Sequence, residues 1–85
     1  MTQPDLLAAL TEIFRENFDD EKLVLTMKTT AGDIAGWDSA KMVMLVLAVE
    51  ERFDVRFRSR EIDALRSIGD WVALIEAAAA SRPQL

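Results

Sequence analysis

The sequence predicts an all-α fold, a small antiparallel four-helix bundle with three longer helices and one short helix. Ala, Leu and Glu, which favour helices, are abundant, and only two prolines and three glycines interrupt the 85 residues. Apolar residues recur at helical spacing in separate segments of the chain. The length suits one domain, residues 1–85, with a single small core.

The N-terminal part of the chain is expected to hold one helix followed by a long loop. The helix is predicted over roughly residues 4–17, where Pro4 suits its opening and Asp5 complements its positive end. The apolar stripe of this helix is formed by Leu6, Leu10, Ile13 and Phe14. The loop contains polar clusters and two glycines, and its expected buried anchors are Leu23, Leu25 and Ile34.

The second helix is expected to start at Asp38 or Ser39 and to run to about Arg52. Its expected core stripe consists of Met42, Leu45, Val46, Val49 and Phe53. The alternation in "FDVRFRSR" is typical of a strand, but one short strand has nothing here to pair with. This segment is therefore interpreted as an extended linker that turns Val55 and Phe57 inward. Its arginines are expected outside, in a set of Arg56, Arg58 and Arg60 paired with Glu50, Glu51 or Glu61.

Two more helices are expected towards the C-terminus. Ser59 can cap a short helix over residues 60–66, with Glu61 in its first turn. Ser67 and Asp70 approximate a capping box before the last helix, "WVALIEAAAA". The residues of this helix that are expected to face the core are Trp71 or Val72, Ile75 and Ala78 or Ala79.

Charge and hydropathy exclude several classes of function. The formal net charge is -5, and an acidic protein repels phosphate backbones, so nucleic acid is not an expected partner. A basic surface on another protein is a better candidate. The longest apolar run, residues 42–49, is too short to span a membrane, and the N-terminus lacks the basic region of a secretory signal. The chain is expected to be cytoplasmic and, because no heptad seam is present, monomeric.

The side chains needed for most stand-alone catalysis are missing. Without His or Cys there is no Ser–His or Cys–His pair and no histidine-ligated metal. Lys41 is a poor base for a serine two residues away. The acidic cluster "FDDEK" lacks the alternating ligands and the central glycine of a calcium loop. The chain is therefore predicted not to be an enzyme and to hold neither a catalytic residue nor a metal.

Ser39 has two interpretations on the residues alone. Serine is a preferred residue at a helix start, so Ser39 can be a cap and nothing more. However, Asp38 can supply the cap oxygen itself, which would leave the Ser39 hydroxyl exposed in the first turn. A helix N-terminus also favours an anion, so a phosphodiester on this serine would have part of its charge stabilised.

The segments "GWDSAKMVMLVLAVEERFDVRF" and "IDALRSIGDWVALI" resemble the acyl carrier proteins of the phosphopantetheine-binding family, over nearly the whole chain. The resemblance implies that Ser39 is the attachment site of 4'-phosphopantetheine, transferred from coenzyme A by a magnesium-dependent phosphopantetheinyl transferase. It implies that Asp38 helps to position that transfer. The arm would carry acyl groups as thioesters to acyl ligases or acyltransferases, synthases and modifying enzymes, and its thiol accounts for the absence of cysteine.

The sequence departs from the commonest pattern of that family near the serine. Ala40 stands where a leucine usually follows, and Lys41 and Met44 stand where acidic residues are frequent. These departures favour a discrete carrier of a specialised pathway, such as polyketide or other secondary-metabolite biosynthesis, over housekeeping fatty-acid synthesis. Two alternatives stay open: an aminoacyl or peptidyl carrier, and an unmodified helical interaction module in which Ser39 is only a cap.

A partner-docking surface is expected on the outer and flanking faces of the second helix. The residues assigned to it are Ala40, Lys41, Met44, Leu47 and Glu51, with Ile62 from the short helix. Met44 and Leu47 are apolar at positions where polar residues are usual, which indicates docking if both are exposed. The other interpretation is that Leu47 borders the core and only Met44 is exposed. An acyl chain is expected to enter between the second, third and fourth helices.

Overall fold

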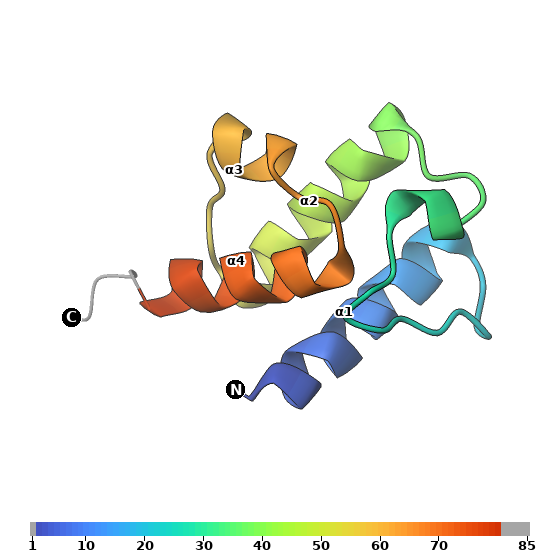
Figure 1. Cartoon of the computed structure of the whole chain (residues 1–85), viewed down its shortest axis with the longest axis horizontal. Coiled ribbons are helices and arrows are strands. Elements are labelled where there is room, and N and C mark those ends of the chain that lie inside the picture. The colour runs from blue at the N-terminus through green and yellow to red at the C-terminus, as the bar shows by residue number, and fades with distance from the viewer. Residues whose placement is uncertain (1, 81–85) are drawn as a thin grey trace.

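The computed structural model describes residues 2–80, which form a small bundle of helices (Figure 1). Within these residues the elements are α1 (Gln3–Phe18), η1 (Ala31–Asp33, a 3-10 turn), α2 (Ser39–Phe53), α3 (Ser59–Asp63) and α4 (Ile68–Ala80). Three longer helices, one short helix and a long loop between α1 and α2 confirm the predicted class.

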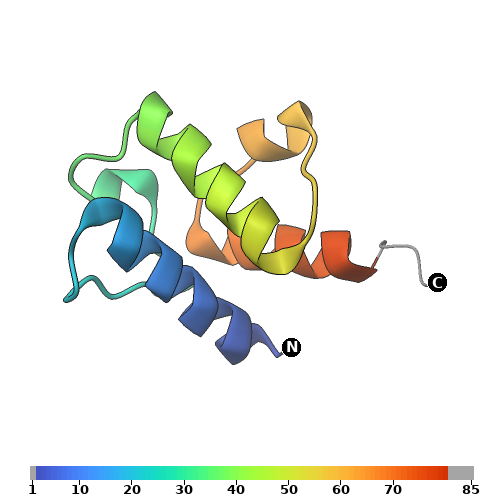
Figure 2. The same cartoon turned by 180° about the vertical axis from the view of Figure 1, so that it is seen from behind.

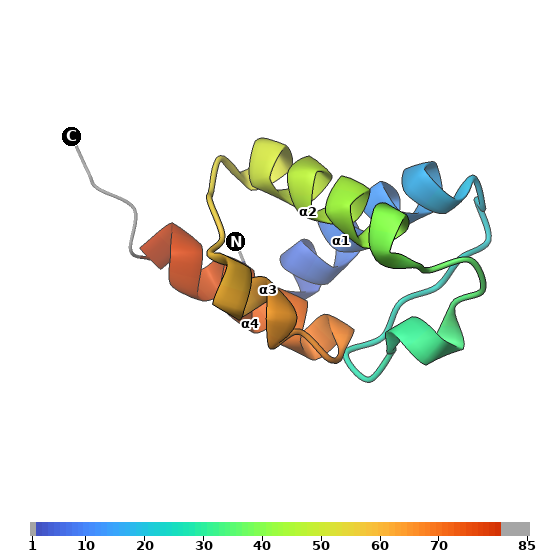
Figure 3. The ribbon, with the colours of Figure 1, turned by 90° about the horizontal axis from the view of Figure 1, so that it is seen from above.

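The helices α1 and α2 lie side by side and run in opposite directions (Figures 1 and 2). Helix α1 packs against both α2 and α4. The start of α2 lies at the same end of the molecule as the end of α1, and α3 lies at the edge, between α2 and α4 along the chain (Figure 3). This arrangement places the loop before Ser39 against the C-terminal end of α1.

Local hydrogen bonds explain where α1 begins and ends. Thr2 and Asp5 form a capping box, because the Asp5 carboxylate accepts from the Thr2 N–H at 3.0 Å and the Thr2 hydroxyl accepts from the Asp5 N–H at 3.3 Å. At the other end, Asp19 adopts a left-handed conformation with φ 50° and its N–H bonds to the last turn. The helix is one residue longer at each end than predicted.

Helix α3 is shorter than the predicted 60–66, and the difference has a clear cause. The Asp70 carboxylate accepts from the N–H groups of Arg66 (2.8 Å) and Ser67 (3.1 Å), so these two residues form the cap that precedes α4 and do not extend α3. The Ser67 hydroxyl accepts from the Asp70 N–H at 3.3 Å, which completes the predicted capping box. Ser59 is the first residue of α3 and not its cap, a correction of the prediction.

The core is formed almost entirely by the stripes that periodicity predicted. All four predicted residues of α1 are buried, as are Leu45, Val46 and Val49 of α2, whereas Met42 and Phe53 are half-buried at its edge. Both Trp71 and Val72 are buried, together with Ile75. The loop anchors Leu25 and Ile34 are buried, and Leu23 is half-buried. Ala9 and Ile68 are buried core residues that the prediction missed.

The segment after α2 is an extended linker, as predicted, with Val55 buried and Phe57 half-buried. The expected arginine–glutamate pairs are not formed within residues 2–80, because two of the glutamates bind backbone instead. Glu50, only 8% exposed, accepts from the Phe57 N–H at 2.8 Å, and Glu61 accepts from the Arg58 N–H at 2.8 Å. These carboxylates satisfy linker amides that no ladder or helix satisfies.

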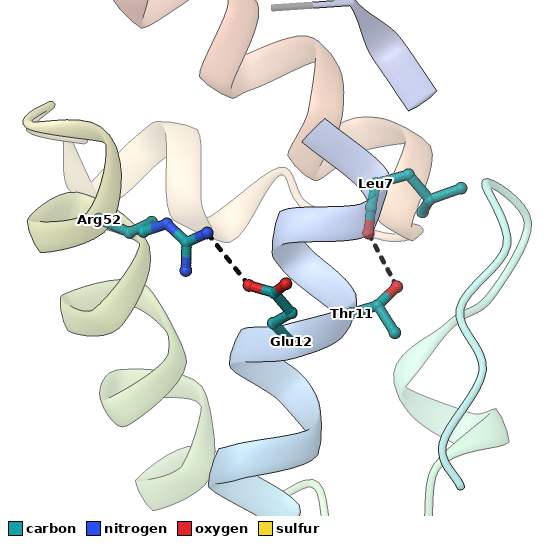
Figure 4. Close-up of polar contacts among 4 residues, drawn as sticks. All are labelled: Leu7, Thr11, Glu12 and Arg52. Carbon is teal, nitrogen blue, oxygen red and sulfur yellow. Dashed lines mark hydrogen bonds and ion pairs between the residues drawn. The ribbon is translucent and has the colours of Figure 1, made fainter. Parts of the chain in front are cut away.

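One ion pair joins the last turn of α2 to α1 (Figure 4). Arg52 Nη2 lies 3.1 Å from Glu12 Oε2. The preceding residue of α1, Thr11, donates its hydroxyl to the Leu7 carbonyl at 2.8 Å. The Arg52 and Glu12 side chains are 49% and 62% exposed, so water screens the attraction. The pair therefore adds about 1 kcal/mol at most to stability, and the core holds the helices together.

Candidate functional site

Asp38, and not Ser39, caps the N-terminus of α2. The Asp38 carboxylate accepts from the Lys41 N–H at 2.8 Å, and the Asp38 carbonyl accepts from the Met42 N–H at 2.9 Å. Ser39 is therefore the first helical residue. The division of roles that the sequence left open, with an aspartate cap and a free serine hydroxyl, is the one that the structure adopts.

The Ser39 side chain is exposed, and its hydroxyl has no hydrogen-bond partner among residues 2–80. The N–H groups of Ser39 and Ala40 lie in the first turn, where no intrahelical acceptor exists. These donors and the positive end of the helix dipole favour an anion bound to Ser39 Oγ. The arrangement thus fits a phosphodiester attached at this oxygen.

Trp37 anchors the segment that leads into Ser39. Its ring stands edge-on to Phe14 of α1, with centroids 5.2 Å apart and planes at 75°, and lies 6.1 Å from the Phe18 ring. On its other side it lies 6.3 Å from the Trp71 ring of α4. Gly36, with φ 85°, makes the turn that delivers Trp37 to this cluster. The sequence prediction missed this role of Trp37.

Lys41 is half-buried and is directed towards α1, not to the outer face of α2. Its ammonium donates to the Asn17 carbonyl at 2.5 Å and lies 5.2 Å from the centroid of the Phe18 ring. Among the residues assigned to docking, Lys41 is thus the one whose polar group is engaged by another helix of the same chain.

The outer face of α2 next to Ser39 is apolar. Val43, Met44 and Leu47 are 58%, 52% and 59% exposed, and Ala40 is exposed beside them. Leu47 does not border the core, so the interpretation in which only Met44 is exposed is wrong, and both side chains are exposed. Val43 was missed, although residues three and four apart share a helix face and Val43 is four residues before Leu47. Glu51, also exposed, lies one turn further along.

Ile62 is half-buried and packs against the core from α3. A shallow hollow of about 280 Å³ lies between α3 and α4. Its lining consists of Glu61, Ala64, Leu65, Asp70, Ala73 and Leu74. A larger hollow of about 600 Å³ lies between the linker and α4, with Arg56 and Arg58 among its lining residues.

In residues 2–80 no three acidic side chains come close enough together to hold a metal ion. Across the same residues, no helix combines the length and the apolar character needed to cross a bilayer.

The fold and the site define a class of protein, a small helical domain that exposes a serine at the start of its second long helix, next to an aspartate cap. A family model described as a phosphopantetheine attachment site matches residues 8–75. The chain belongs to this phosphopantetheine attachment family. The resemblance to acyl carrier proteins is confirmed, and covalently attached phosphopantetheine is the cofactor of the family.

Individual relatives agree with this assignment. The chain is 28% identical over 76 residues to an acyl carrier protein of Exiguobacterium sibiricum, covering 89% of this chain and 96% of that one. It is 29% identical over 83 residues to the meromycolate extension acyl carrier protein of Mycolicibacterium smegmatis, covering 98% and 84%.

Solved structures have the same fold. The solution structure of the holo acyl carrier protein of Geobacter metallireducens superposes with a TM-score of 0.82 and 39% identity, covering 87% of this chain and 85% of that chain. The acyl carrier protein of Thermotoga maritima superposes with a TM-score of 0.80 at 23% identity, over 92% and 91%, which supports the fold alone.

Proposed function

We propose that Ser39 carries 4'-phosphopantetheine and that the chain holds acyl groups as thioesters on that arm. The observation that carries this proposal is the exposed Ser39 hydroxyl in the first turn of α2, with Asp38 as the cap. Because Asp38 satisfies the helix end, the serine oxygen is available to form a phosphodiester without loss of the cap. When bound, the arm supplies the thiol that the chain lacks.

The residues around Ser39 have separate tasks in this proposal. The free N–H groups at the head of α2 stabilise the phosphodiester charge. Asp38 uses Oδ1 for the Lys41 N–H, while its Oδ2 has no hydrogen-bond partner within residues 2–80. That second oxygen is free to position the transfer from coenzyme A, by a hydrogen bond or a contact to the magnesium of the transferase.

We infer that partner enzymes dock on the apolar face of α2 formed by Ala40, Val43, Met44 and Leu47. These side chains begin one residue after the attachment serine, so an enzyme that covers them also receives the arm. The exposed area, on the order of a few hundred Å², suits a transient contact and is well below that of a stable dimer. Glu51 at the far end, and Ile62 on α3, would border the contact.

The cargo is proposed to be acyl, because the relatives named above are acyl carriers. A specialised biosynthetic pathway in the cytoplasm, polyketide or another secondary metabolite, remains the proposal for its setting. The grounds are Ala40, Lys41 and Met44, which replace the residues frequent in the family. In this role the chain is a substrate of its partners, among them the transferase, acyl ligases or acyltransferases, and synthases.

Intact mass spectrometry tests the attachment directly. The wild-type chain and Ser39→Ala are incubated with coenzyme A, magnesium and a broad-specificity phosphopantetheinyl transferase. We expect a gain of one phosphopantetheinyl group in the wild type alone. If several transferases leave the folded wild type unmodified, Ser39 is only an exposed helix residue and the chain is an interaction module.

A second assay separates acyl from aminoacyl carriage. The modified protein is offered to acyl ligases with fatty or malonyl-type acids and to ligases with amino acids. Loading by the first group alone supports the acyl proposal, whereas loading by amino acids alone makes the chain an aminoacyl or peptidyl carrier.

A further inference from the structure

Two side chains that bracket the attachment serine are both fastened to the same end of α1. Trp37, two residues before Ser39, has its ring against Phe14 and Phe18. Lys41, two residues after it, donates to the Asn17 carbonyl and lies over the Phe18 ring. The start of α2 is thus held to the C-terminal end of α1 on both sides of the serine (Figures 1 and 2).

The contacts of Lys41 are those of a helix cap supplied by another helix. Asn17 is the penultimate residue of α1, so its carbonyl accepts no hydrogen bond from an N–H group within the helix. A cation at this end is favoured by the negative end of the α1 dipole. An ordered lysine loses side-chain entropy, which the charge-assisted bond and the cation–π contact offset.

The same residue also belongs to the cap of α2. The Lys41 backbone N–H donates to Asp38 Oδ1 at 2.8 Å while its ammonium donates to Asn17 O at 2.5 Å. Lys41 therefore couples the capping of α2 to the end of α1. Ser39 lies between Asp38 and Lys41 in the sequence. Without the ammonium contact, the first turn of α2 would lose its side-chain hydrogen bond to α1, and only the local hydrogen bonds and the packing of half-buried Met42 would limit fraying.

We propose that Trp37 and Lys41 form a clamp that holds the first turn of α2 on α1, and that Lys41 is a positioning residue for phosphopantetheine transfer rather than a docking contact. The proposal rests on the proposed attachment at Ser39. Transfer requires Ser39 Oγ to be aligned with the phosphorus of coenzyme A, and small displacements of a reacting group lower the rate strongly. The docking face keeps Ala40, Val43, Met44 and Leu47.

The test compares Lys41→Met, which keeps an apolar stem on Phe18 but removes the ammonium, with Lys41→Arg, which keeps a cation. Lys28→Met is the matched control, because Lys28 is exposed in the loop and its side chain makes no hydrogen bond within residues 2–80. Urea unfolding establishes that all variants are folded.

Amide hydrogen exchange is the first measurement and needs no transferase. We expect exchange at Lys41 and Met42 to rise about tenfold in Lys41→Met and to return to the wild-type rate in Lys41→Arg. Unchanged exchange in Lys41→Met overturns the clamp. This result is independent of whether Ser39 is ever modified, so it stands even if the proposed function fails.

Transfer kinetics are the second measurement, with coenzyme A, magnesium and a transferase that modifies the wild type. A positioning role predicts a several-fold lower kcat for Lys41→Met, an unchanged KM for the carrier, and rescue by Lys41→Arg. A raised KM with unchanged kcat would mean that Lys41 touches the transferase, and would overturn the proposal. Failure of every transferase on the wild type would count against the attachment, not against the clamp.

Discussion

At the start of α2, Asp38 caps the helix and Ser39 is left out of the cap. The Asp38 carboxylate accepts a hydrogen bond from the Lys41 N–H, so the helix end is capped without the Ser39 side chain. The Ser39 side chain is exposed, and its hydroxyl makes no hydrogen bond within residues 2–80. A serine hydroxyl that does not cap the helix is available for the covalent attachment proposed at this position.

This division predicts different costs for the two residues. Asp38→Ala should lower the free energy of unfolding by about 1 kcal/mol, because the Lys41 N–H loses its acceptor. Ser39→Ala should change it by less than about 0.5 kcal/mol, because no bond is lost. Urea unfolding at neutral pH measures both.

Asp38→Asn separates the cap from the charge, because asparagine also caps well. We expect Asp38→Asn to have the free energy of unfolding of the wild type, unlike Asp38→Ala, but a lower rate of transfer from coenzyme A. A Ser39→Ala variant as unstable as Asp38→Ala would show that the serine is part of the cap.

Asp5 gives α1 a pH-dependent cap. Hydrogen bonds from the backbone N–H and then the side chain of Thr2 hold the pKa of the Asp5 carboxyl below its ordinary value of 3.8. A lowered pKa in the folded state stabilises the fold above the unfolded-state value, and that contribution is lost as the pH falls through the folded value.

Asp5→Asn should therefore remove part of the loss of stability below about pH 4. Urea unfolding between neutral pH and strong acid, for the wild type and Asp5→Asn, measures this. Glu16→Gln is the control, since Glu16 is an exposed carboxylate of the same helix. An equal acid dependence in wild type and Asp5→Asn would contradict the assignment.

At the scale of elements, α2 has one face buried in the core and one exposed apolar face, which is the face proposed for docking. Val49 and Leu45 are fully buried, whereas Val43, Met44 and Leu47 are more than half exposed. A single exposed apolar residue carries little meaning, but three on one face of the helix that begins at Ser39 support the docking surface proposed above.

Leu47→Glu should weaken docking without weakening the fold, because the side chain is 59% exposed. We expect the KM of the transferase for the carrier to rise about tenfold, the effect of 1.4 kcal/mol of lost binding. Val24→Glu is a matched control, since Val24 is 69% exposed but lies in the loop after α1. Equal effects of the two changes would show that added charge, and not the α2 face, is responsible.

The whole molecule combines a well-filled core with a weakly held edge. The rings of Phe14, Trp37 and Trp71 form a contiguous cluster that joins α1, the loop and α4. Helix α3 has only five residues, and none of them is fully buried. An acyl chain that enters between α2, α3 and α4 would meet least resistance at this edge, where Ile62 packs against the core.

Ile62→Trp should reduce acyl sequestration by filling that entry. The measurement is the change in NMR shifts of core residues such as Leu45 and Ile68 when the arm is loaded with an acyl group. Arg60→Trp, an exposed change on the same helix, is the control. We expect smaller shift changes in Ile62→Trp than in Arg60→Trp, and equal changes would contradict entry at α3. The larger side chain should cost about 1–3 kcal/mol of stability, which urea unfolding checks.

The sequence by itself determined the helical class, the core stripes of α1, α2 and α4, the capping box before α4 and the start of α2 at Asp38 or Ser39, whereas the structure decided that Asp38 is the cap. These features follow from spacing and from hydrogen bonds between residues a few positions apart. The end of α3 was misjudged because the Asp70 carboxylate competes for the N–H groups of Arg66 and Ser67.

Only the tertiary structure decided which flanking residues are covered. Periodicity assigns Lys41 to the edge of a helix, but its direction towards Asn17 depends on where α1 ends. Likewise, Leu47 is exposed because no element of residues 2–80 covers that side of α2, and Trp37 is engaged because α1 and α4 bring aromatic rings to it. Local spacing specifies which face of an element is apolar, whereas contacts between distant segments decide what lies against it.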